Sequence, residues 1–369
     1  MKESNDKMYI LQWNCRSILK NLPQFENHIL QNRYAILALQ SLNVEAHRLP
    51  KFNSFYYPPL YTCKTTTKRV QTAIYIRADL SYSPLAPSPV PNITDTFFAT
   101  AVTVKVNNQT NLNVLSVYYP QGPKHDNSDW IKQISISRNK WIVLGDFNAH
   151  APFWETDCSL VTCNRFVENI VDSQLVLLND GSVTRLPDIP NHKPTSIDLS
   201  LVSPDLAVNA HWSVEEDTLG SDHFPVILQL NEKIIEEDSD IEDKVPKFMY
   251  KNADWQLYQS KLLSIDHAAI PDDNIDIFYS NFCQAVLSAA KLSIPKCKNA
   301  KTLKYIGNAW WNKQCEEAVS LKKTAFKKWI RDRSDSNFIE MKQAKNHSNR
   351  VVAQAKRTYF SDFCRSEIL

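Results

Sequence analysis

The stretch Trp141-Ile-Val-Leu-Gly-Asp-Phe-Asn148 joins an apolar run to two polar side chains. The run from Trp141 to Leu144 predicts a buried β-strand, because consecutive apolar residues suit a strand that is covered on both faces. Gly145 interrupts the run, and Asp146 and Asn148 follow it two residues apart. A buried strand holds the residues at its end rigidly, so this stretch predicts a strand that presents functional groups where it ends.

Similar apolar segments recur through residues 1–231. We predict strands at Tyr9–Trp13, Ala35–Leu39, Ala73–Ile76, Phe97–Val106, Leu112–Tyr118, Trp141–Leu144, Ile197–Val202 and Phe224–Leu230. Helical periodicity is confined to about Ser17–Gln31 and about Cys163–Asp172. Because several strands follow one another without a helix between them, a strictly alternating parallel sheet is disfavoured. The pattern predicts an α/β fold, a two-sheet β-sandwich flanked by helices.

The charge distribution divides the chain, although the formal net charge is only +2. Residues 232–276 carry 5 Lys and Arg against 12 Asp and Glu, whereas residues 295–369 carry 17 against 7. The most acidic stretch of the chain ends at Pro246, and its composition is typical of a solvated linker. We therefore predict three parts, which are a domain over 1–231, an acidic linker over 232–250 and an α-helical C-terminal region over 251–369.

Helical periodicity dominates the region after the linker. Helices are predicted at Asp254–Leu263, Ile275–Ser293, Ala309–Arg331 and Asp335–Arg365. In the third helix Lys322, Lys323, Lys327 and Lys328 stand among aromatic residues, which predicts a face that binds nucleic-acid phosphates. The alternative is a solvated helix whose aromatic side chains pack on a polymerase domain.

The composition excludes several classes of protein. Apolar residues make up 43% of the chain and aromatic residues 11%, which is incompatible with disorder over most of its length. The eight cysteines include no Cys-x-x-Cys pair, so we expect neither a zinc site nor a disulfide framework. No apolar stretch approaches the ~18 residues of a membrane span, and the first residues show no apolar signal region. We expect a soluble intracellular protein that is not secreted and contacts no membrane.

Polar residues gather where the predicted strands of the first domain begin or end. They are Asn14, Tyr118, Asp146, Asn148, Asp198, Asp222 and His223. A single Asp or Asn at a turn usually satisfies only backbone groups, but this combination suits metal-assisted phosphodiester hydrolysis. Carboxylate and amide oxygens bind Mg²⁺, and neutral or cationic donors stabilise the charge that develops on the phosphate oxygens.

Glycine is scarce, and its positions coincide with these groups. The chain has five glycines, of which Gly122, Gly145 and Gly220 stand beside the polar residues. Glycine allows backbone conformations and close approaches that other residues resist. We therefore expect these three to shape the loops that aim the polar side chains.

These motifs resemble the endonuclease/exonuclease/phosphatase superfamily, whose fold is DNase I-like. The resemblance is carried by Gly-Asp-Phe-Asn at 145–148 and by Ser-Asp-His at 221–223, in that order. Within the superfamily the chain is similar to the endonuclease domain of non-LTR (LINE, jockey-like) retrotransposons. Trp154 downstream of Gly-Asp-Phe-Asn-Ala-His, and Gly-Ser-Asp-His-Phe-Pro-Val at 220–226, support that narrower match.

The C-terminal region supports the same resemblance. Trp310-Trp-Asn-Lys-Gln-Cys315 and Ala355-Lys-Arg-Thr-Tyr-Phe360 resemble the helical segment that precedes reverse transcriptase in such polyproteins. The Tyr/Phe-x-Asp-Asp motif of the polymerase is absent from the sequence. The resemblance thus implies an endonuclease domain with the pre-polymerase helices and without the polymerase.

The resemblance also implies a role for each polar residue. Asn148 and Tyr118 would contact the scissile phosphate, and Asp146 would position the attacking water. His223, oriented by Asp198, would stabilise the phosphorane.

A metal ion and a DNA partner are implied in the same way. Asn14 and Asp222 would lie on the side of a Mg²⁺ or Mn²⁺ ion, and Thr195 and Ser196 would lie near the DNA backbone. The implied activity is a metal-dependent DNA endonuclease that nicks target DNA in the nucleus for target-primed reverse transcription. RNA or a reverse transcriptase domain would be a further partner of the basic C-terminal helices.

The sequence departs from the family at one metal ligand. The family reads Leu-Gln-Glu after the second strand, whereas this chain has Leu39-Gln-Ser41. A neutral hydroxyl is a poor ligand for Mg²⁺, and Glu45 stands ~13 Å farther along an extended strand. Loss of a charged ligand predicts a reaction slower by about a thousandfold or more, so the activity of this copy is left open.

Two other functions stand beside the endonuclease. One is a catalytically impaired remnant that binds nucleic acid, which Ser41 and the basic C-terminal helices favour. The other is a phosphatase of the same superfamily that acts on a small substrate. The helices after residue 300 weigh against the phosphatase, because such an enzyme has no evident use for them.

Overall fold

The computed structural model of the protein describes residues 7–52, 55–85, 96–106, 110–123, 128–137, 139–155, 164–187, 192–231, 252–264, 275–295, 310–332 and 334–366. By packing, the chain forms two compact units. The larger comprises Met1–Glu237 together with Ile306–Leu369, and the smaller comprises Asp238–Tyr305. The acidic linker expected over 232–250 lies wholly outside the described residues. The expected domain boundaries at 231 and 251 stay a prediction.

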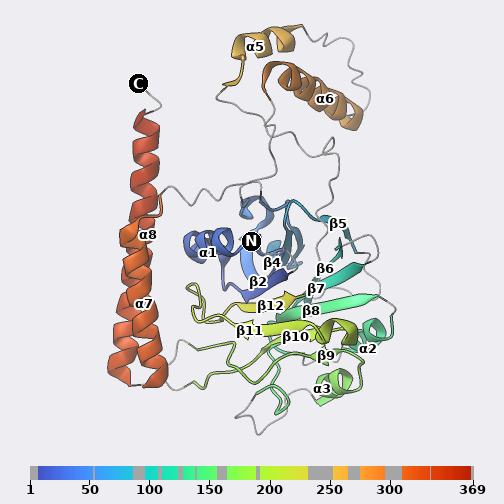
Figure 1. Ribbon diagram of the computed structural model, residues 1–369, viewed down its shortest axis with the longest axis vertical. Helices are drawn as coiled ribbons and strands as arrows, with labels where there is room; N and C mark the ends of the chain where they lie inside the picture. Colours follow the sequence, from blue (N-terminus) through green and yellow to red (C-terminus); the bar gives the residue numbers. More distant parts are fainter. Residues whose placement is uncertain are drawn as a thin grey trace, which may run out of the picture. The chain divides into compact units, whose positions relative to one another are not determined.

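The first of two six-stranded sheets has the strand order β11-β12-β1-β2-β4-β3 (Figure 1). Its strands are β1 (Met8–Asn14), β2 (Ile36–Glu45), β3 (Leu60–Cys63), β4 (Arg69–Ile76), β11 (Ala210–Val214) and β12 (Val226–Leu230). The strand β1 runs parallel to β2 and antiparallel to β12. The end of β1 therefore lies beside the segment that leads into β12.

The second sheet has the order β5-β6-β7-β8-β10-β9. Its strands are β5 (Ser81–Pro84), β6 (Phe98–Lys105), β7 (Asn111–Tyr118), β8 (Lys140–Asp146), β9 (Val176–Leu177) and β10 (Asp198–Val202). Asp146 is opposite Tyr118 in the parallel pair β7–β8 and opposite Asp198 in the antiparallel pair β8–β10. This register brings three of the expected functional residues to one edge of the sheet.

The two sheets pack face to face on an apolar core. Ile10 and Ile36 of the first sheet share this core with Val114 and Ile142 of the second. Alternate residues of the strands point outward, as the pleat of a β-strand requires. The outward residue Trp13 of the first sheet stacks on Phe25 of α1 (Ile18–Asn32), with ring centroids 4.9 Å apart.

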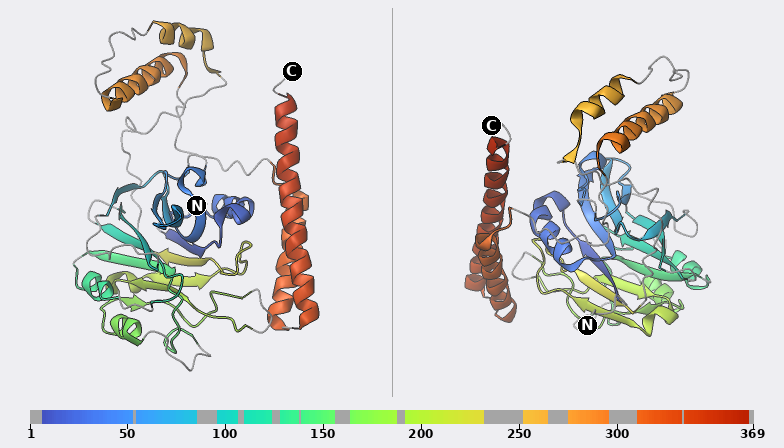
Figure 2. Two further views of the ribbon diagram at one scale, coloured as in Figure 1. Left: turned by 180° about the vertical axis from the view of Figure 1, so that it is seen from behind. Right: turned by 45° about the horizontal axis from the view of Figure 1, so that its top comes forward.

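Helices α2 (Trp130–Ser135) and α3 (Asn164–Val171) cover the outer face of the second sheet. Trp141 and Val143 of β8 pack there against Ile134 and Phe166 of the two helices. The larger unit thus has an α/β/β/α arrangement, which the two views of Figure 2 also show. The expected fold, a two-sheet sandwich flanked by helices and followed by a helical region, is confirmed.

The short elements of the sandwich were not predicted. They are β3, β5, β9 and β11, together with the 3-10 helix η1 (Ala46–Arg48) and the helices α2 and α4 (Pro204–Ala207). Several have few buried side chains, so their hydrophobic pattern is weak; β5 is an example. The strand expected at Phe224–Leu230 begins only at Val226. Pro225 precedes it, and proline has no backbone N–H to donate to a neighbouring strand.

The C-terminal helices follow the predicted boundaries closely. The smaller unit contains α5 (Trp255–Leu263) and α6 (Ile275–Ser293), and the larger contains α7 (Lys313–Arg331) and α8 (Asp335–Ser366). Helices α7 and α8 lie side by side (Figures 1 and 2). No helix in the described part of the chain is both long and apolar enough to cross a membrane.

Candidate active site

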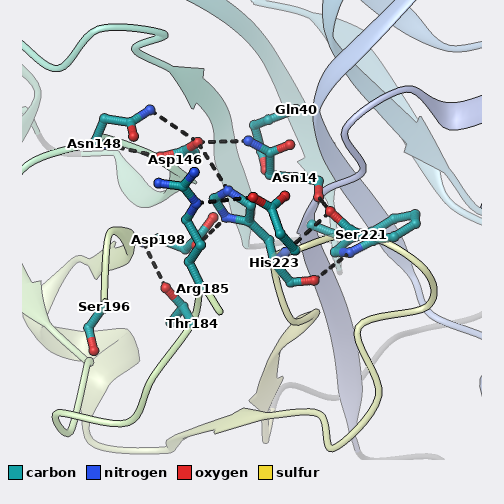
Figure 3. A network of polar contacts seen from close by, with 12 residues as sticks. Asn14, Gln40, Asp146, Asn148, Thr184, Arg185, Ser196, Asp198, Ser221 and His223 are labelled. Atoms are coloured by element: carbon teal, nitrogen blue, oxygen red, sulfur yellow. Dashed lines mark hydrogen bonds and ion pairs between the residues drawn. The ribbon is translucent and has the colours of Figure 1, made fainter. Parts of the chain in front are cut away.

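The polar residues expected from the sequence meet where strands of both sheets end. Figure 3 shows Asn14, Asp146, Asn148, Asp198 and His223 in one network. Asn14 ends β1, Asp146 ends β8 and Asp198 begins β10. The structure thus brings together residues that lie more than 200 positions apart in the chain.

Asp146 is the centre of this network and is only 1% exposed. Its Oδ2 accepts hydrogen bonds from Nδ2 of Asn14 at 2.7 Å and from Nδ2 of Asn148 at 3.3 Å. Its Oδ1 accepts from the backbone N–H of Asn148 at 3.0 Å. The two amides therefore fix the orientation of the carboxylate.

His223 lies between the two buried carboxylates. Its Nδ1 is 2.8 Å from Oδ2 of Asp198, and its Nε2 is 3.9 Å from Oδ2 of Asp146. Asp198 is fully buried, and its other oxygen accepts a hydrogen bond of 3.0 Å from Gln12. Asp198 therefore orients the imidazole ring so that the opposite ring nitrogen faces the Asp146 side of the site.

Burial and charge shift the protonation of these groups in a consistent way. Burial lowers the pKa of His223, but the charges of Asp198 and Asp146 outweigh it and raise the pKa to about 9. Burial raises the pKa of Asp146, and the charge of His223 only partly opposes this rise. At neutral pH the imidazole is a cation with two N–H donors, and Asp146 is more basic than an exposed aspartate.

Two glutamines that the sequence did not single out extend the network into the space between the sheets. Gln12 and Gln40 are both fully buried, and Nε2 of Gln12 is 3.1 Å from Oε1 of Gln40. Gln40 also donates to Oγ of Ser116 at 2.8 Å. A buried amide needs a hydrogen-bond partner. A glutamine inside an apolar strand therefore indicates a buried polar contact, and this was the sequence signal that could have revealed both residues.

Backbone geometry at the turn after β8 depends on two glycines. A Cβ atom at Gly145 would lie 2.1 Å from the carbonyl oxygen of Val117, so only glycine allows β8 to pass β7 there. Gly122 has φ +71°, and a Cβ there would lie 2.8 Å from the carbonyl oxygen of Asn148. Both glycines thus position the loop that carries Asn148, in agreement with the expectation from the sequence.

Tyr118 and Tyr119 take different roles, as neighbours on a strand should. Tyr118 is half-buried, and its hydroxyl interacts with the side chain of Ser41, which partly offsets the rise in pKa that burial causes. Tyr119 is only 3% exposed and packs on Phe97 and Phe147. Tyr119 therefore serves packing.

Asp146, Asp198 and His223 offer three ligand atoms within 4.8 Å of one another, but His223 could bind a metal ion only after losing a proton. The residues expected on the metal side are a different set: Asn14, Asp222 and the position of Ser41. Oδ1 of Asn14 already accepts a hydrogen bond of 3.1 Å from the backbone N–H of Arg16. Ser41 contributes only a neutral hydroxyl.

Asp222 decides how well this second set fits a divalent cation. Its Oδ1 is buried with no hydrogen-bond partner among the described residues, which would suit an ion. Its Oδ2, however, lies 3.2 Å from Nη1 of Arg16 and 3.2 Å from Nε of Arg185. Two guanidinium groups therefore surround the one carboxylate of this set, and the set does not fit a Mg²⁺ ion.

The two hydroxyl residues expected near DNA do not present their hydroxyls to solvent. Ser196 is 2% exposed, and its Oγ donates to the carbonyl of Ser182 at 2.7 Å. Oγ1 of Thr195 is buried without a hydrogen-bond partner among the described residues. These residues shape the loop around Arg185, which pairs with Thr195 in an isolated bridge.

The four lysines expected to bind nucleic acid differ in position. Lys322 is only 5% exposed; its Nζ lies 2.8 Å from Oδ1 of Asp217 and donates to Gln24 at 2.9 Å. Lys322 therefore joins α7 to the sandwich and is not exposed for DNA. Lys323, Lys327 and Lys328 are exposed, although Lys327 and Lys328 form ion pairs with Glu216 and Glu340.

Comparison with known proteins agrees with this architecture. Residues 112–227 match the family described as endonuclease-reverse transcriptase. The endonuclease domain of TRAS1, a telomere-specific non-LTR retrotransposon, has a similar fold with a TM-score of 0.51 and 17% identity. That match covers 62% of this chain and all of the TRAS1 domain.

Two curated relatives come from Drosophila melanogaster. The probable RNA-directed DNA polymerase from transposon BS is 21% identical over 95% of this chain, and that from transposon X-element is 22% identical over 96%. The chain spans 38% of the length of each relative. These matches agree with the resemblance seen in the sequence: residues 112–227 match the endonuclease-reverse transcriptase family, and the sandwich has a fold similar to that of a non-LTR retrotransposon endonuclease domain.

Proposed function

We propose that this chain nicks target DNA for the retrotransposition of a non-LTR element. The observation that carries the proposal is the buried network in which Asn14 and Asn148 hold Asp146 beside the Asp198–His223 pair. Such a network costs desolvation energy and is maintained only when every member is paired. Its members also have the chemistry that phosphodiester hydrolysis needs.

Each member has a defined task in this reaction. Asp146, with its raised pKa, takes a proton from water as the water oxygen bonds to phosphorus. The cationic His223 donates a hydrogen bond to the phosphate oxygen on which negative charge increases, and Asp198 stabilises that cation. The bond from phosphorus to the 3′ oxygen breaks, this oxygen takes a proton from solvent water, and the resulting 3′-hydroxyl can prime a polymerase.

A second function is favoured by the position of Ser41. With a hydroxyl in place of the family's glutamate, the site would retain DNA binding while hydrolysis is slow; this is the impaired nucleic-acid-binding remnant. The resemblance also implies dependence on Mg²⁺ or Mn²⁺, and RNA or a reverse transcriptase domain as further partners. No step above depends on a metal ion.

The test is nicking of supercoiled plasmid by the full chain, with Mg²⁺ or with EDTA. Asp146→Asn and His223→Gln preserve side-chain size and are compared with His211→Gln, which changes an exposed histidine of β11. We expect nicking by the wild type and by His211→Gln, with at least a hundredfold loss in the two site variants. Extension of the nick by a DNA polymerase reports the 3′-hydroxyl.

The outcomes separate the two functions. DNA binding without nicking supports the impaired remnant and overturns the endonuclease. Nicking that persists in both site variants contradicts the assignment of the site. Circular dichroism of each variant establishes that it is folded.

A further inference from the structure

Two arginines from separate loops converge on one buried carboxylate beside the site. Arg16 follows β1, and Arg185 lies in the loop that pairs with Thr195 and His223. The side chain of Asp222 is 3% exposed, whereas those of Arg16 and Arg185 are 58% and 35% exposed. The buried carboxylate thus forms an ion pair with each guanidinium group, and both arginine side chains remain partly exposed to solvent.

The turn that carries Arg16 is attached to the strand that carries Ser41. The backbone N–H of Ser17 donates to the carbonyl of Ser41 at 2.9 Å, and that of Cys15 donates to Gln40 at 3.0 Å. Arg16 and Ser17 have φ angles of 42° and 80°, in the left-handed region that costs about 1 kcal/mol or more for a residue with a side chain. This backbone places the start of the Arg16 side chain next to the position where the family has its glutamate.

The charge immediately around Asp222 is therefore opposite to that of a cation site. A glutamate at position 41 and Asp222 would together supply two negative charges, which match a divalent cation. Here Ser41 is neutral, and Asp222 with its two arginines has a net charge of +1. Burial alone would raise the pKa of Asp222, but His223 and the two guanidinium groups hold it below its ordinary value, so the carboxylate stays charged.

Arg185 also lies near the groups that handle the phosphate. It forms an isolated β-bridge with His223, and its Nε is 3.2 Å from Oδ2 of Asp222, the residue directly before His223 (Figure 3). A guanidinium group presents planar, paired N–H donors that match phosphate oxygens, and it supplies the positive charge that a metal ion would otherwise supply.

We propose that Arg16 and Arg185 form a built-in cationic cradle that binds a phosphodiester of DNA without a divalent cation. The inference rests on the proposed function, because it names how the same site holds its DNA substrate. In this arrangement Asp222 is a positioning residue for the two arginines. The arginines contact the phosphate directly.

The experiment measures binding of the full chain to a fluorescent DNA duplex by anisotropy, at one ionic strength, in EDTA and in Mg²⁺. We expect dissociation constants that agree within about threefold between the two conditions. Arg16→Gln and Arg185→Gln should each weaken binding about tenfold, the effect of losing one charge-assisted contact. Arg48→Gln, which removes an exposed arginine of η1, is the matched control and should change binding less than threefold.

A complementary variant retains both arginines. Ser41→Glu adds a carboxylate beside Arg16, so it should weaken binding in EDTA and restore it in Mg²⁺. Thermal unfolding of each variant identifies any that fail to fold. Arg16→Lys and Arg185→Lys then replace the glutamine variants. Lysine keeps the positive charge but lacks the planar pair of donors, so these variants should lose less affinity than the glutamine variants.

The outcomes distinguish this inference from the proposed function. Failure to bind DNA in both conditions would overturn both. Binding that requires Mg²⁺ would overturn the cradle and leave the proposed function standing. If the dissociation constant in EDTA is unchanged by both arginine substitutions, the DNA binds elsewhere on the chain, and the cradle is overturned as well.

Discussion

The two sides of the site are built in different ways. The hydrolytic side, formed by Asp146, Asp198 and His223, is at most 4% exposed, and each member is bonded to another member or to an amide. The cation side is open only in part: Asp222 is 4% exposed, but Ser41 is half-buried and the Arg16 side chain is 58% exposed. The first side keeps the residues that the family resemblance implies, whereas the second keeps Asn14 and Asp222 but has Ser41 in place of a glutamate.

Burial explains why the two sides differ in their tolerance to change. Removing one partner of a buried ion pair leaves an uncompensated charge and costs about 3–5 kcal/mol, so the hydrolytic side is tied to folding. An exposed group can be replaced at a cost of about 0.5 kcal/mol, because water solvates whatever is left. Substitutions at Ser41 or Arg16 should therefore cost little folding stability.

The largest effect on stability should come from His223→Ala. The substitution leaves Asp146 and Asp198 as neighbouring buried carboxylates without their cation, so we expect the free energy of unfolding to fall by about 3–5 kcal/mol. Urea denaturation followed by tryptophan fluorescence measures the change. His211→Ala, on an exposed position of β11, should cost less than about 0.5 kcal/mol. If the two substitutions lowered the free energy of unfolding equally, the claim that the hydrolytic side is tied to folding would be wrong.

Lysines on α7 extend the comparison between buried and exposed charge. Lys322→Ala leaves the buried Asp217 without its ammonium partner, so we expect a loss of about 3 kcal/mol. Lys323→Ala changes the next residue, which is exposed, and should cost less than about 0.5 kcal/mol. Denaturation of both variants, monitored by helical circular dichroism, measures the contrast. A small effect at Lys322 would show that this pair does not hold α7 on the sandwich.

A pH titration of stability should report the hydrolytic side. The folded-state pKa of His223, about 9, lies above its ordinary value of 6.5, so folding favours the protonated form. Its contribution is fully present below pH 6.5 and is lost as the pH rises through 9. The free energy of unfolding should therefore fall between these values by up to about 1.4 kcal/mol per pH unit. The decline should be shallower in His223→Gln, and an unchanged decline would assign it to other groups.

The open side should show the smallest effect on stability. Arg16→Gln removes a partly solvated ion pair and leaves Arg185 beside Asp222, so we expect a loss of about 1 kcal/mol or less in unfolding free energy. The same variant should nevertheless weaken DNA binding about tenfold. Thermal and urea unfolding measure the first quantity. A loss as large as that of His223→Ala would mean that Arg16 serves folding more than binding.

Local patterns predicted the parts of the site that depend on neighbours in sequence. Asp146 and Asn148 follow a strand that apolar residues reveal, and Asp222 and His223 precede another. Gln12 and Gln40 were missed because a strand pattern does not show which inward position faces a polar partner across the sheets.

The positions of the arginine pair and of Lys322 were not predicted from sequence patterns. The approach of Arg16 and Arg185 to Asp222 depends on contacts between distant segments, so neither arginine has a local signal. Lys322 was expected on a DNA-binding face. The spacing of buried residues along α7, namely Cys315, Ala318, Lys322, Ala325 and Trp329, could have placed it on the inward stripe.

The central claim is that arginines occupy the side of the site where the resemblance implies a metal ion. It is tested most directly by titration of the full chain with Mn²⁺ under electron paramagnetic resonance. The wild type should bind no stoichiometric Mn²⁺ that depends on Asp222, as shown by comparison with Asp222→Asn. The double variant Ser41→Glu with Arg16→Asn, which supplies a second carboxylate and removes one guanidinium, should gain a site at least tenfold tighter. One tightly bound Mn²⁺ per wild-type chain that disappears in Asp222→Asn would contradict the account.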